Sequence, residues 1–337
     1  MKRLNISSIL IASGLATSAM ANTPYTYNAL QTDTPPVIDG VLDDASWHNA
    51  KATSLFVLHN NGQYIALSDT WAKVTYDADN LYIAYWAQDR HLSASYQNHD
   101  DPTYQNDDTV EVFLDPDGDG KNYYELGISL NTAYDVVIHQ PSPWSDDLAW
   151  NIEGLEHAVT VQGTVNDDSD VDEGYRVEVK IPLKSLNYLG NGNEEYQHKL
   201  WRFNLFRANY KSYAPDWEAY AWLSWSPVGS FGFHQPDTFA FLNFSDVPQW
   251  QAKAYQAGEQ VAYQGDIYQA EHYSATAAPG ESTLDNWRIL SDIPTPYNAN
   301  LYYLAGDQVS MDDVIYQANW KTKGQHPAHS VDWTRLP

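Results

Sequence analysis

Short runs in which apolar and polar residues alternate occur throughout the first two thirds of the chain. Alternation of period two is typical of strands with one buried face, and no long stretch repeats apolar residues at the helical period. Clusters of Asp, Asn and Gly at 77–80 and 117–120 favour turns between the runs. The pattern predicts an all-β domain over residues 22–246, an antiparallel β-sandwich of the jelly-roll or DOMON-like type, with one helical turn at 182–186. The predicted strands are 71–76, 81–86, 109–114, 123–128, 175–181 and 200–206.

The C-terminal part of the chain contains one short pattern twice. Each copy has an Ala-Gly turn, a Tyr-Gln-Ala strand and a final Trp, which is Trp287 in the first copy and Trp333 in the second. Each copy predicts a small module of three short antiparallel strands, at 248–291 and 297–337, joined by a linker at 291–296. The hairpin turns are expected at 265–266 and 312–313. Units this small have little core, so a doubled unit favours surface binding by avidity over catalysis.

The doubled pattern resembles the chitin-binding type 3 module of carbohydrate-binding families 5 and 12, because the Ala-Gly, Tyr-Gln-Ala and Trp blocks recur in that order in both copies. The resemblance implies that chitin or a related polysaccharide is the ligand, and that aromatic rings after Tyr-Gln-Ala face it. Tyr273 and Trp320 occupy these positions within polar sequence that favours exposure. Trp250, Trp287 and Trp333 are further candidates, although Trp287 and Trp333 also suit the core of so small a module.

Five blocks of the larger domain, in order, resemble the family 9 carbohydrate-binding module and its DOMON-like relatives. They include IDGVLDDASW at 38–47, DDTVEVFLDPD at 107–117 and FLNF at 241–244. The resemblance implies a β-sandwich that holds a sugar between two aromatic rings, with a Glu as hydrogen-bond partner. The nearest positions are Tyr104, Phe233 and Glu111, and Trp144 and Trp217 in acidic loops are alternatives to the two rings.

Asp115, Asp117 and Asp119 alternate with Pro and Gly after a predicted strand. Oxygen ligands at this spacing open a Ca²⁺ loop, but the Glu that an EF-hand needs at the twelfth position is replaced by Leu126. Ca²⁺ is therefore the cofactor that the sequence suggests, with an acidic hairpin turn as the alternative. Haem held through Met is not expected, because the only methionines are Met1, Met20 and Met311. Copper of the kind held by an N-terminal His is not expected either.

The chain begins with a basic segment, a short apolar run and Ala-Met-Ala at 19–21. This pattern predicts a cleaved signal peptide over residues 1–21, hence a secreted, extracellular or periplasmic protein with Asn22 at its mature N-terminus. The chain has no Cys and a formal net charge of −26. Such a charge argues against nucleic acid and anionic lipid as partners, no run is long enough to insert into a membrane, and a monomer is expected.

The acidic run at 167–173 is a near miss to the family 18 chitinase signature, with its Glu one residue early. No other catalytic motif occurs that combines residue type and spacing. The sequence therefore favours a non-catalytic polysaccharide-binding protein that acts in the recognition or degradation of chitinous material. Two alternatives remain: a glycoside hydrolase with an unrecognised site in the sandwich, and an adhesion protein anchored on chitin.

Overall fold

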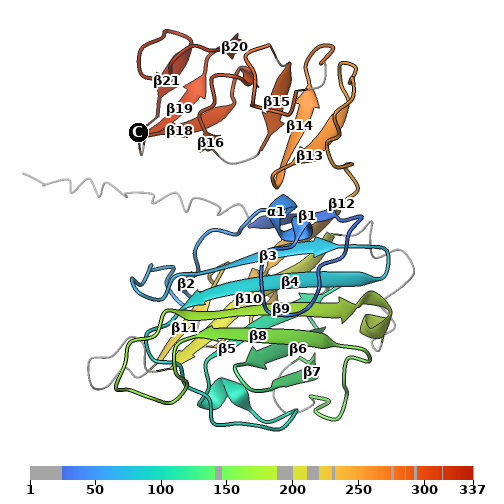
Figure 1. Cartoon of the computed structure of the whole chain (residues 1–337), viewed down its shortest axis with the longest axis vertical. Helices are drawn as coiled ribbons and strands as arrows, with labels where there is room; N and C mark the ends of the chain where they lie inside the picture. The colour runs from blue at the N-terminus through green and yellow to red at the C-terminus, as the bar shows by residue number, and fades with distance from the viewer. Residues whose placement is uncertain are drawn as a thin grey trace, which may run out of the picture.

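The computed structural model describes residues 25–140, 146–187, 200–210, 220–229, 232–274, 277–284, 286–291, 294–312 and 314–336. These residues are nearly all in strands and loops, and form a large curled sandwich and a smaller tail (Figure 1). A short α-helix, α1 (Ala45–Asn49), packs its Trp47 against Tyr82 and Ala84 on the sandwich. No described helix is long and apolar enough to cross a membrane. The predicted signal peptide, Trp144 and Trp217 lie outside the described residues.

The sandwich strands are hydrogen-bonded in the order β7-β6-β5-β10-β12-β1-β3-β4-β9-β8, with β11 added beside β10 and β2 beside β11. The all-β sandwich expected from the alternation is confirmed, and each of the six predicted strands is present. The 3₁₀ turn at Leu183–Asn187 stands where a helical turn was expected. The strands are β1 (Thr26–Gln31), β2 (Val57–Leu58), β3 (Thr70–Tyr76), β4 (Asn80–Gln88), β5 (Thr109–Asp115), β6 (Asn122–Ser129), β7 (Ala133–His139), β8 (Glu156–Gln162), β9 (Gly174–Pro182), β10 (Leu200–Tyr210), β11 (Tyr220–Ser224) and β12 (Ala240–Ser245).

Strand β1 joins the two layers of the sandwich. It pairs in parallel with β12 on one side and with β3 on the other, whereas the other sandwich pairings recorded are antiparallel. The expectation of an antiparallel sheet therefore fails at this one strand. The main core lies between the layers and contains Trp201, Tyr76 and Phe244. The opposite face of β5, β6 and β10 carries a second, aromatic cluster, which includes Phe113, Phe206 and Phe233.

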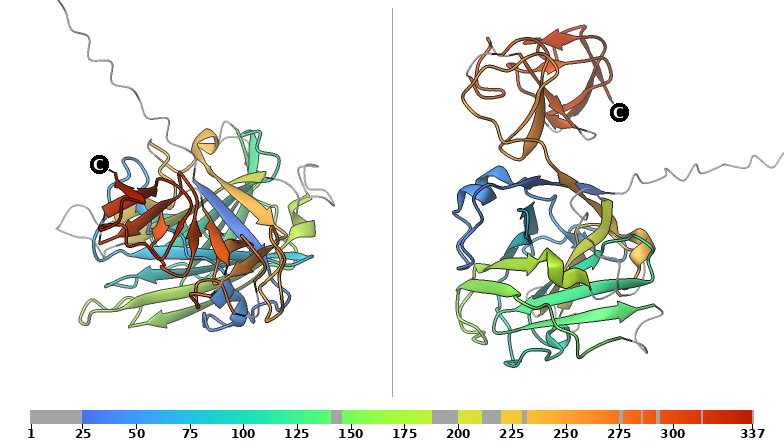
Figure 2. Two further views of the ribbon diagram at one scale, coloured as in Figure 1. Left: turned by 90° about the horizontal axis from the view of Figure 1, so that it is seen from above. Right: turned by 90° about the vertical axis from the view of Figure 1, so that its right-hand side faces the viewer.

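The two repeats form the tail, which stands at one end of the sandwich (Figure 2). In the first copy Tyr263 pairs with Asp266, so the turn residues are Gln264 and Gly265, both with positive φ. This turn is one residue earlier than expected, because a two-residue hairpin of this kind requires positive φ at both positions. The tail strands are β13 (Gln260–Tyr263), β14 (Asp266–Ala270), β15 (Trp287–Leu290), β16 (Thr295–Pro296), β17 (Tyr302–Tyr303), β18 (Gln308–Met311), β19 (Val314–Ala318), β20 (Thr322–Lys323) and β21 (Trp333–Arg335).

The two repeats pack against each other, and the segment between them takes part in the packing. β17 of the second copy pairs with β15 of the first, and one hydrophobic cluster includes both Trp287 and Trp333. The expected linker contributes β16, which pairs with β18. Between the copies, Arg288 donates two hydrogen bonds to Asp307, at 2.9 and 2.7 Å. The tail is therefore one packed body, because each copy alone has too little core.

Candidate functional site

Strands β5, β6 and β7 carry a polar cluster on the face opposite the main core. Glu111, Gly127 and Tyr134 stand directly opposite one another across the three strands. A Cβ at Gly127 would overlap the ring of Tyr134, so the missing side chain allows this ring to lie across β6. The Tyr134 hydroxyl then donates a hydrogen bond of 2.7 Å to Oε1 of Glu125.

The cluster holds two buried carboxyl groups with acceptor capacity left over. The Oε2 atoms of Glu111 and Glu125 are buried and have no hydrogen-bond partner among the described residues. Burial raises the pKa of Glu111 well above its usual range, and the charge of Glu125 adds to this rise. Burial also raises the pKa of Glu125, although His234, whose Nε2 lies 3.8 Å from Oε2 of Glu125, opposes the shift. The pair therefore offers oxygens that hydroxyl donors from a ligand would satisfy.

An exposed ring stands beside these carboxyls. Tyr104, in a 3₁₀ turn (Thr103–Gln105), is 42% exposed and meets Tyr134 edge to face, with ring centroids 5.7 Å apart. Phe233 is only 7% exposed and stacks on Phe206 at 4.1 Å. Of the three residues expected here, Tyr104 and Glu111 meet through Tyr134, whereas Phe233 lies in the aromatic cluster beneath the surface.

Glu125, Tyr134 and His234 were not singled out from the sequence. Their association depends on the pairing of β5 with β6 and of β6 with β7, which no local pattern reveals. The sequence does contain one signal that could have identified Glu125. It is the only charged residue of the predicted strand at 123–128. A charged residue that falls on a buried strand position needs either a partner or a functional reason.

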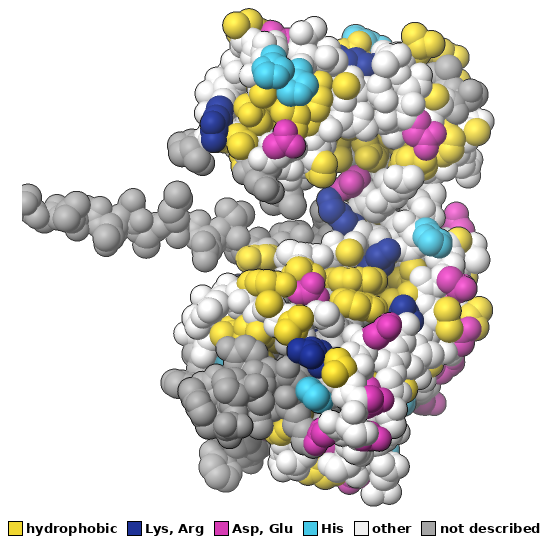
Figure 3. All heavy atoms as spheres, turned by 60° about the vertical axis from the view of Figure 1, so that its left-hand side comes forward, with side chains coloured by type: hydrophobic (Ala, Val, Ile, Leu, Met, Phe, Trp, Pro, Cys, Tyr) yellow, Lys and Arg dark blue, Asp and Glu magenta, His cyan; other side chains and the backbone are white. Residues whose placement is uncertain are grey.

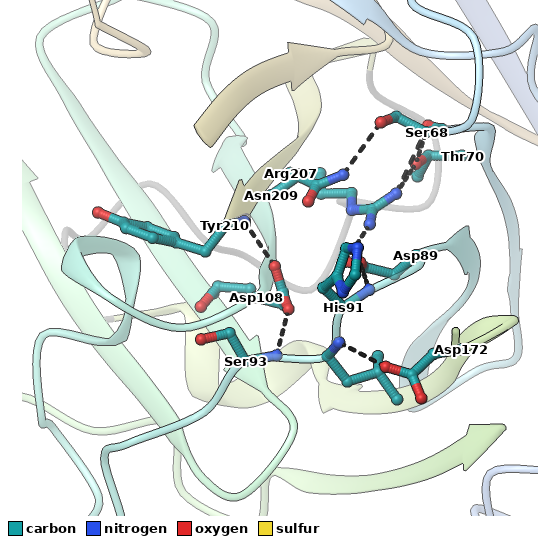
Figure 4. Close-up of polar contacts among 12 residues, drawn as sticks. Ser68, Thr70, Asp89, His91, Ser93, Asp108, Asp172, Arg207, Asn209 and Tyr210 are labelled. Carbon is teal, nitrogen blue, oxygen red and sulfur yellow. Dashed lines mark hydrogen bonds and ion pairs between the residues drawn. The ribbon is translucent and has the colours of Figure 1, made fainter. Parts of the chain in front are cut away.

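A buried polar network anchors the loops near this site (Figure 4). Arg207, fully buried on β10, donates hydrogen bonds of 2.7 Å to Asp89 and to the hydroxyl of Thr70. Asp108 accepts hydrogen bonds from the backbone N–H groups of Ser93 and Tyr210, at 2.7 and 2.6 Å. The network therefore fixes both ends of the 93–108 segment, which carries Tyr104.

Comparison with known proteins identifies the larger domain. A family model described as "Carbohydrate family 9 binding domain-like" matches residues 38–242, more than half of the chain. The chain belongs to this family. A structure of a candidate carbohydrate-binding protein from Bacteroides uniformis aligns with a TM-score of 0.54 and 13% identity, over 66% of this chain and 100% of that one. Because the identity is so low, this similarity shows a shared fold only.

Two curated relatives are similar to part of this chain. Exoglucanase XynX from Acetivibrio thermocellus is 31% identical over 156 residues, which is 46% of this chain and 12% of the relative. Endo-1,4-beta-xylanase A from Thermoanaerobacterium saccharolyticum is 29% identical over 153 residues, which is 45% of this chain and 11% of the relative. The chain therefore spans only a small part of the length of these relatives.

Beyond the family 9 domain, the tail exposes two of its candidate rings. Tyr273 is 57% exposed and Trp320 is 48% exposed, whereas Trp287 and Trp333 are buried in the tail core. Trp250 is half-buried and packs edge to face on Tyr263 at 5.5 Å. In the space-filling view, apolar side chains gather on the tail and on the nearest part of the sandwich (Figure 3).

The exposed rings of the tail lie beside a contact between the two copies. Lys321 forms an ion pair of 3.0 Å with Glu271, and its ammonium lies 4.8 Å from the ring centroid of Tyr302. Tyr273 is two residues from Glu271, and Trp320 is adjacent to Lys321. Both rings are therefore within two residues of the contact between the copies.

The acidic turn after β5 brings its three carboxylates together. Ligand oxygens of Asp115, Asp117 and Asp119 lie within 4.8 Å of one another. Burial raises the pKa of Asp115 to about 7, opposed by hydrogen bonds from the backbone N–H groups of Gly118 and Gly120. Three hard oxygen donors this close fit a Ca²⁺ ion, although these internal hydrogen bonds also make an acidic turn that is stable alone.

Proposed function

We propose that this protein is a secreted, non-catalytic polysaccharide-binding protein in which the family 9 domain and the tail bind separately, with chitin as the ligand of the tail. The observation that carries the chitin assignment is the exposure of one ring in each copy, beside the contact between the copies. Tyr273 lies three residues after Ala270, and Trp320 lies two residues after Ala318. Rings that a small, aromatic-rich body leaves exposed are suited to stacking on the apolar faces of sugar rings.

The family 9 domain supplies a second kind of site. Tyr104 presents an exposed ring, and Glu111 and Glu125 supply acceptor oxygens that Tyr134 does not saturate. A sugar has both donor hydroxyls and an apolar ring face, so this pairing of ring and carboxyl suits it. The loops are held by the buried network, so the site needs little reordering to bind, which favours affinity.

The test is retention of the full-length chain on insoluble chitin, with cellulose as the comparison. By analogy with stacking on bases, loss of one stacked ring costs roughly 1–3 kcal/mol, or about 5- to 150-fold in affinity. Tyr273→Ala and Trp320→Ala should each weaken retention, and the double variant should lose more than either. Tyr64→Ala is the matched control, because Tyr64 is also 48% exposed but lies on the sandwich. Unchanged retention of the double variant would refute the assignment.

Hydrolysis is the second candidate function, favoured by the pair Glu111 and Glu125. Glu125 is opposite Phe113 on β5, so the two carboxyls stand on diagonal positions of neighbouring strands. Diagonal neighbours have Cα atoms about 7–8 Å apart, so both carboxyl groups can reach one bound sugar, as the two carboxyl groups of a glycosidase do. Release of soluble sugar from chitin or xylan, abolished by Glu125→Gln, would establish this activity in place of simple binding.

We also propose that the protein is exported and that it binds Ca²⁺. The N-terminal pattern at 1–21 supports cleavage and secretion, which sequencing the mature N-terminus tests directly. Asp115, Asp117 and Asp119 would hold Ca²⁺ beside the end of β5, and the ion would offset their mutual repulsion. A ligand that binds only the folded chain raises its melting temperature, so Ca²⁺ should raise it and EDTA should lower it.

A further inference from the structure

A second polar cluster lies on the other side of β7, away from the sugar site. Asp135 follows Tyr134 and so points to the opposite face of the strand, where its side chain is 1% exposed. His99 and Asp100 approach it from one loop, and Asn151 from another. His99 Nε2 lies 3.0 Å from Oδ1 of Asp135 and 3.4 Å from Oδ1 of Asp100, and it contacts Oδ1 of Asn151.

In this cluster one ring nitrogen faces three oxygens. Nε2 of an imidazole carries at most one hydrogen, so it can donate to only one of them. The Asn151 amide is oriented by its Nδ2, which donates to the carbonyl oxygen of Ala149 at 3.3 Å, so Oδ1 is the atom that faces His99. The cluster therefore contains more acceptors than hydrogens to satisfy them.

The buried carboxyl of Asp135 points into the cluster with one oxygen unsatisfied. Oδ2 accepts a hydrogen bond from the backbone N–H of Ile152, whereas Oδ1 is buried and accepts no hydrogen bond from the described residues. A buried acceptor without a donor is costly and calls for an explanation, of which an absent ion is one. Among the described residues His99 Nε2 is the one nearby donor, and if its single hydrogen is directed at Asp135, the oxygens of Asp100 and Asn151 that face the same nitrogen remain without a donor.

We propose that His99, Asp100, Asp135 and Asn151 bind a divalent ion of borderline softness, with Zn²⁺ as the first choice. An imidazole ligand suits Zn²⁺ and disfavours Ca²⁺ and Mg²⁺, which take oxygen ligands. Donor atoms around a tetrahedral ion with bonds of about 2.1 Å lie about 3.4 Å apart. The separations of 3.0 and 3.4 Å at His99 approach this value, so binding needs only small shifts.

An ion could reach this cluster from solvent on one side, and a buried residue closes the other side. The side chains of His99 and Asp100 are 46% and 37% exposed, whereas Asp135 forms a buried base. The ion would link β7 to both loops. The first loop continues into the 3₁₀ turn that carries Tyr104, so the ion would stiffen the support of the exposed ring at the sugar site.

The experiment is calorimetric titration of the EDTA-treated, full-length chain with ZnCl₂ near neutral pH, together with thermal unfolding with and without Zn²⁺. One equivalent should bind saturably and raise the melting temperature. His99→Ala should weaken the affinity at least tenfold and remove the temperature rise. His326→Ala is the matched control, because His326 stacks on His329 in the tail at 4.6 Å and offers a rival pair of ring nitrogens.

Asp100→Asn, at an exposed position, is the second variant and should also weaken Zn²⁺ binding if His99→Ala fails to fold. The proposal is overturned if Zn²⁺ does not bind saturably or if His99→Ala and Asp100→Asn leave the affinity unchanged. Loss of binding in His326→Ala alone would place the ion in the tail and overturn it as well.

Discussion

Replacement of Arg207 by Met should lower the free energy of unfolding of the family 9 domain more than a substitution at its surface. Arg207 is fully buried, pairs with Asp89 at 2.7 Å, and lies over the ring of Tyr175 with its guanidinium carbon 5.4 Å from the ring centroid. Met keeps much of the apolar stem and removes the charge. Asp89 and Asp108 would then remain buried without a cation to oppose their charges.

The expected loss follows from the burial of the pair. Removal of one partner of a buried ion pair costs about 3–5 kcal/mol, because the other charge stays desolvated. In a domain of this size each kcal/mol lowers the melting temperature by about 2–4 °C, so the shift should be about 6–20 °C. Burial already raises the pKa of Asp89, and Arg207 opposes that rise. Without Arg207 the pKa rises further.

The sign of the pH dependence follows from this rise. A carboxyl whose pKa is higher in the folded state contributes stability below its unfolded pKa of about 3.9, and this stability is lost as the pH rises. The loss caused by Arg207→Met should therefore be larger at pH 7 than at pH 4. Asp89→Asn should restore part of the stability at pH 7 when it is combined with Arg207→Met.

Urea unfolding of the full-length chain, followed by circular dichroism, measures the effect at both pH values. Arg202→Met is the matched control on the same strand, because Arg202 is only half-buried and donates to the carbonyl oxygen of Asp237 at 3.1 Å. It should cost about 1 kcal/mol or less. Equal losses for Arg207→Met and Arg202→Met, or a loss for Arg207→Met that does not change with pH, would refute the assignment of a buried charge pair.

Three further predictions concern the binding parts. Glu111→Gln should lower sugar affinity in a glycan-binding assay. It should also raise the melting temperature increasingly above pH 5, because a carboxyl with a raised pKa loses stability as it deprotonates and Gln cannot. Asp119→Asn should reduce the rise in melting temperature caused by Ca²⁺, and a full response in this variant would remove Asp119 from the ligand set. Arg288→Ala breaks the double hydrogen bond to Asp307 and should weaken chitin retention of the full chain without altering sugar binding by the family 9 domain. Loss of both would instead indicate misfolding.

The strands that the sequence revealed carry long apolar or alternating runs. β4 is mostly apolar and β5 alternates polar and apolar residues, so their patterns were sufficient although both strands are buried on both faces. β8 reads Glu-His-Ala-Val-Thr-Val-Gln at the edge of the sheet and is half solvated throughout, so its pattern is weak. β1 is held by partner strands in both layers. Its parallel pairing depends on residues more than forty positions away, so no local pattern predicts it.

The candidate site was predictable only in part, for a physical reason. Tyr104 and Glu111 were found through family resemblance, and the structure links them through Tyr134, which no local motif identifies. Phe233 carried the same aromatic signal as Tyr104, yet it packs on Phe206 and is buried. Composition shows that rings are abundant. Whether a ring faces solvent depends on which chain segment covers it, and that is decided by tertiary packing.

The packing within the tail, and its contact with the sandwich, determine how the two parts act together. The two copies of the tail share one hydrophobic cluster and the Arg288–Asp307 pair, so the segments that carry Tyr273 and Trp320 belong to one packed body. Between tail and sandwich, Lys51 pairs with Asp266, and both side chains are partly exposed, an arrangement usually worth less than about 1 kcal/mol. The protein should therefore bind as two bodies with adjustable spacing, and its avidity should depend on the segment between β12 and β13 rather than on the spacing of the two copies.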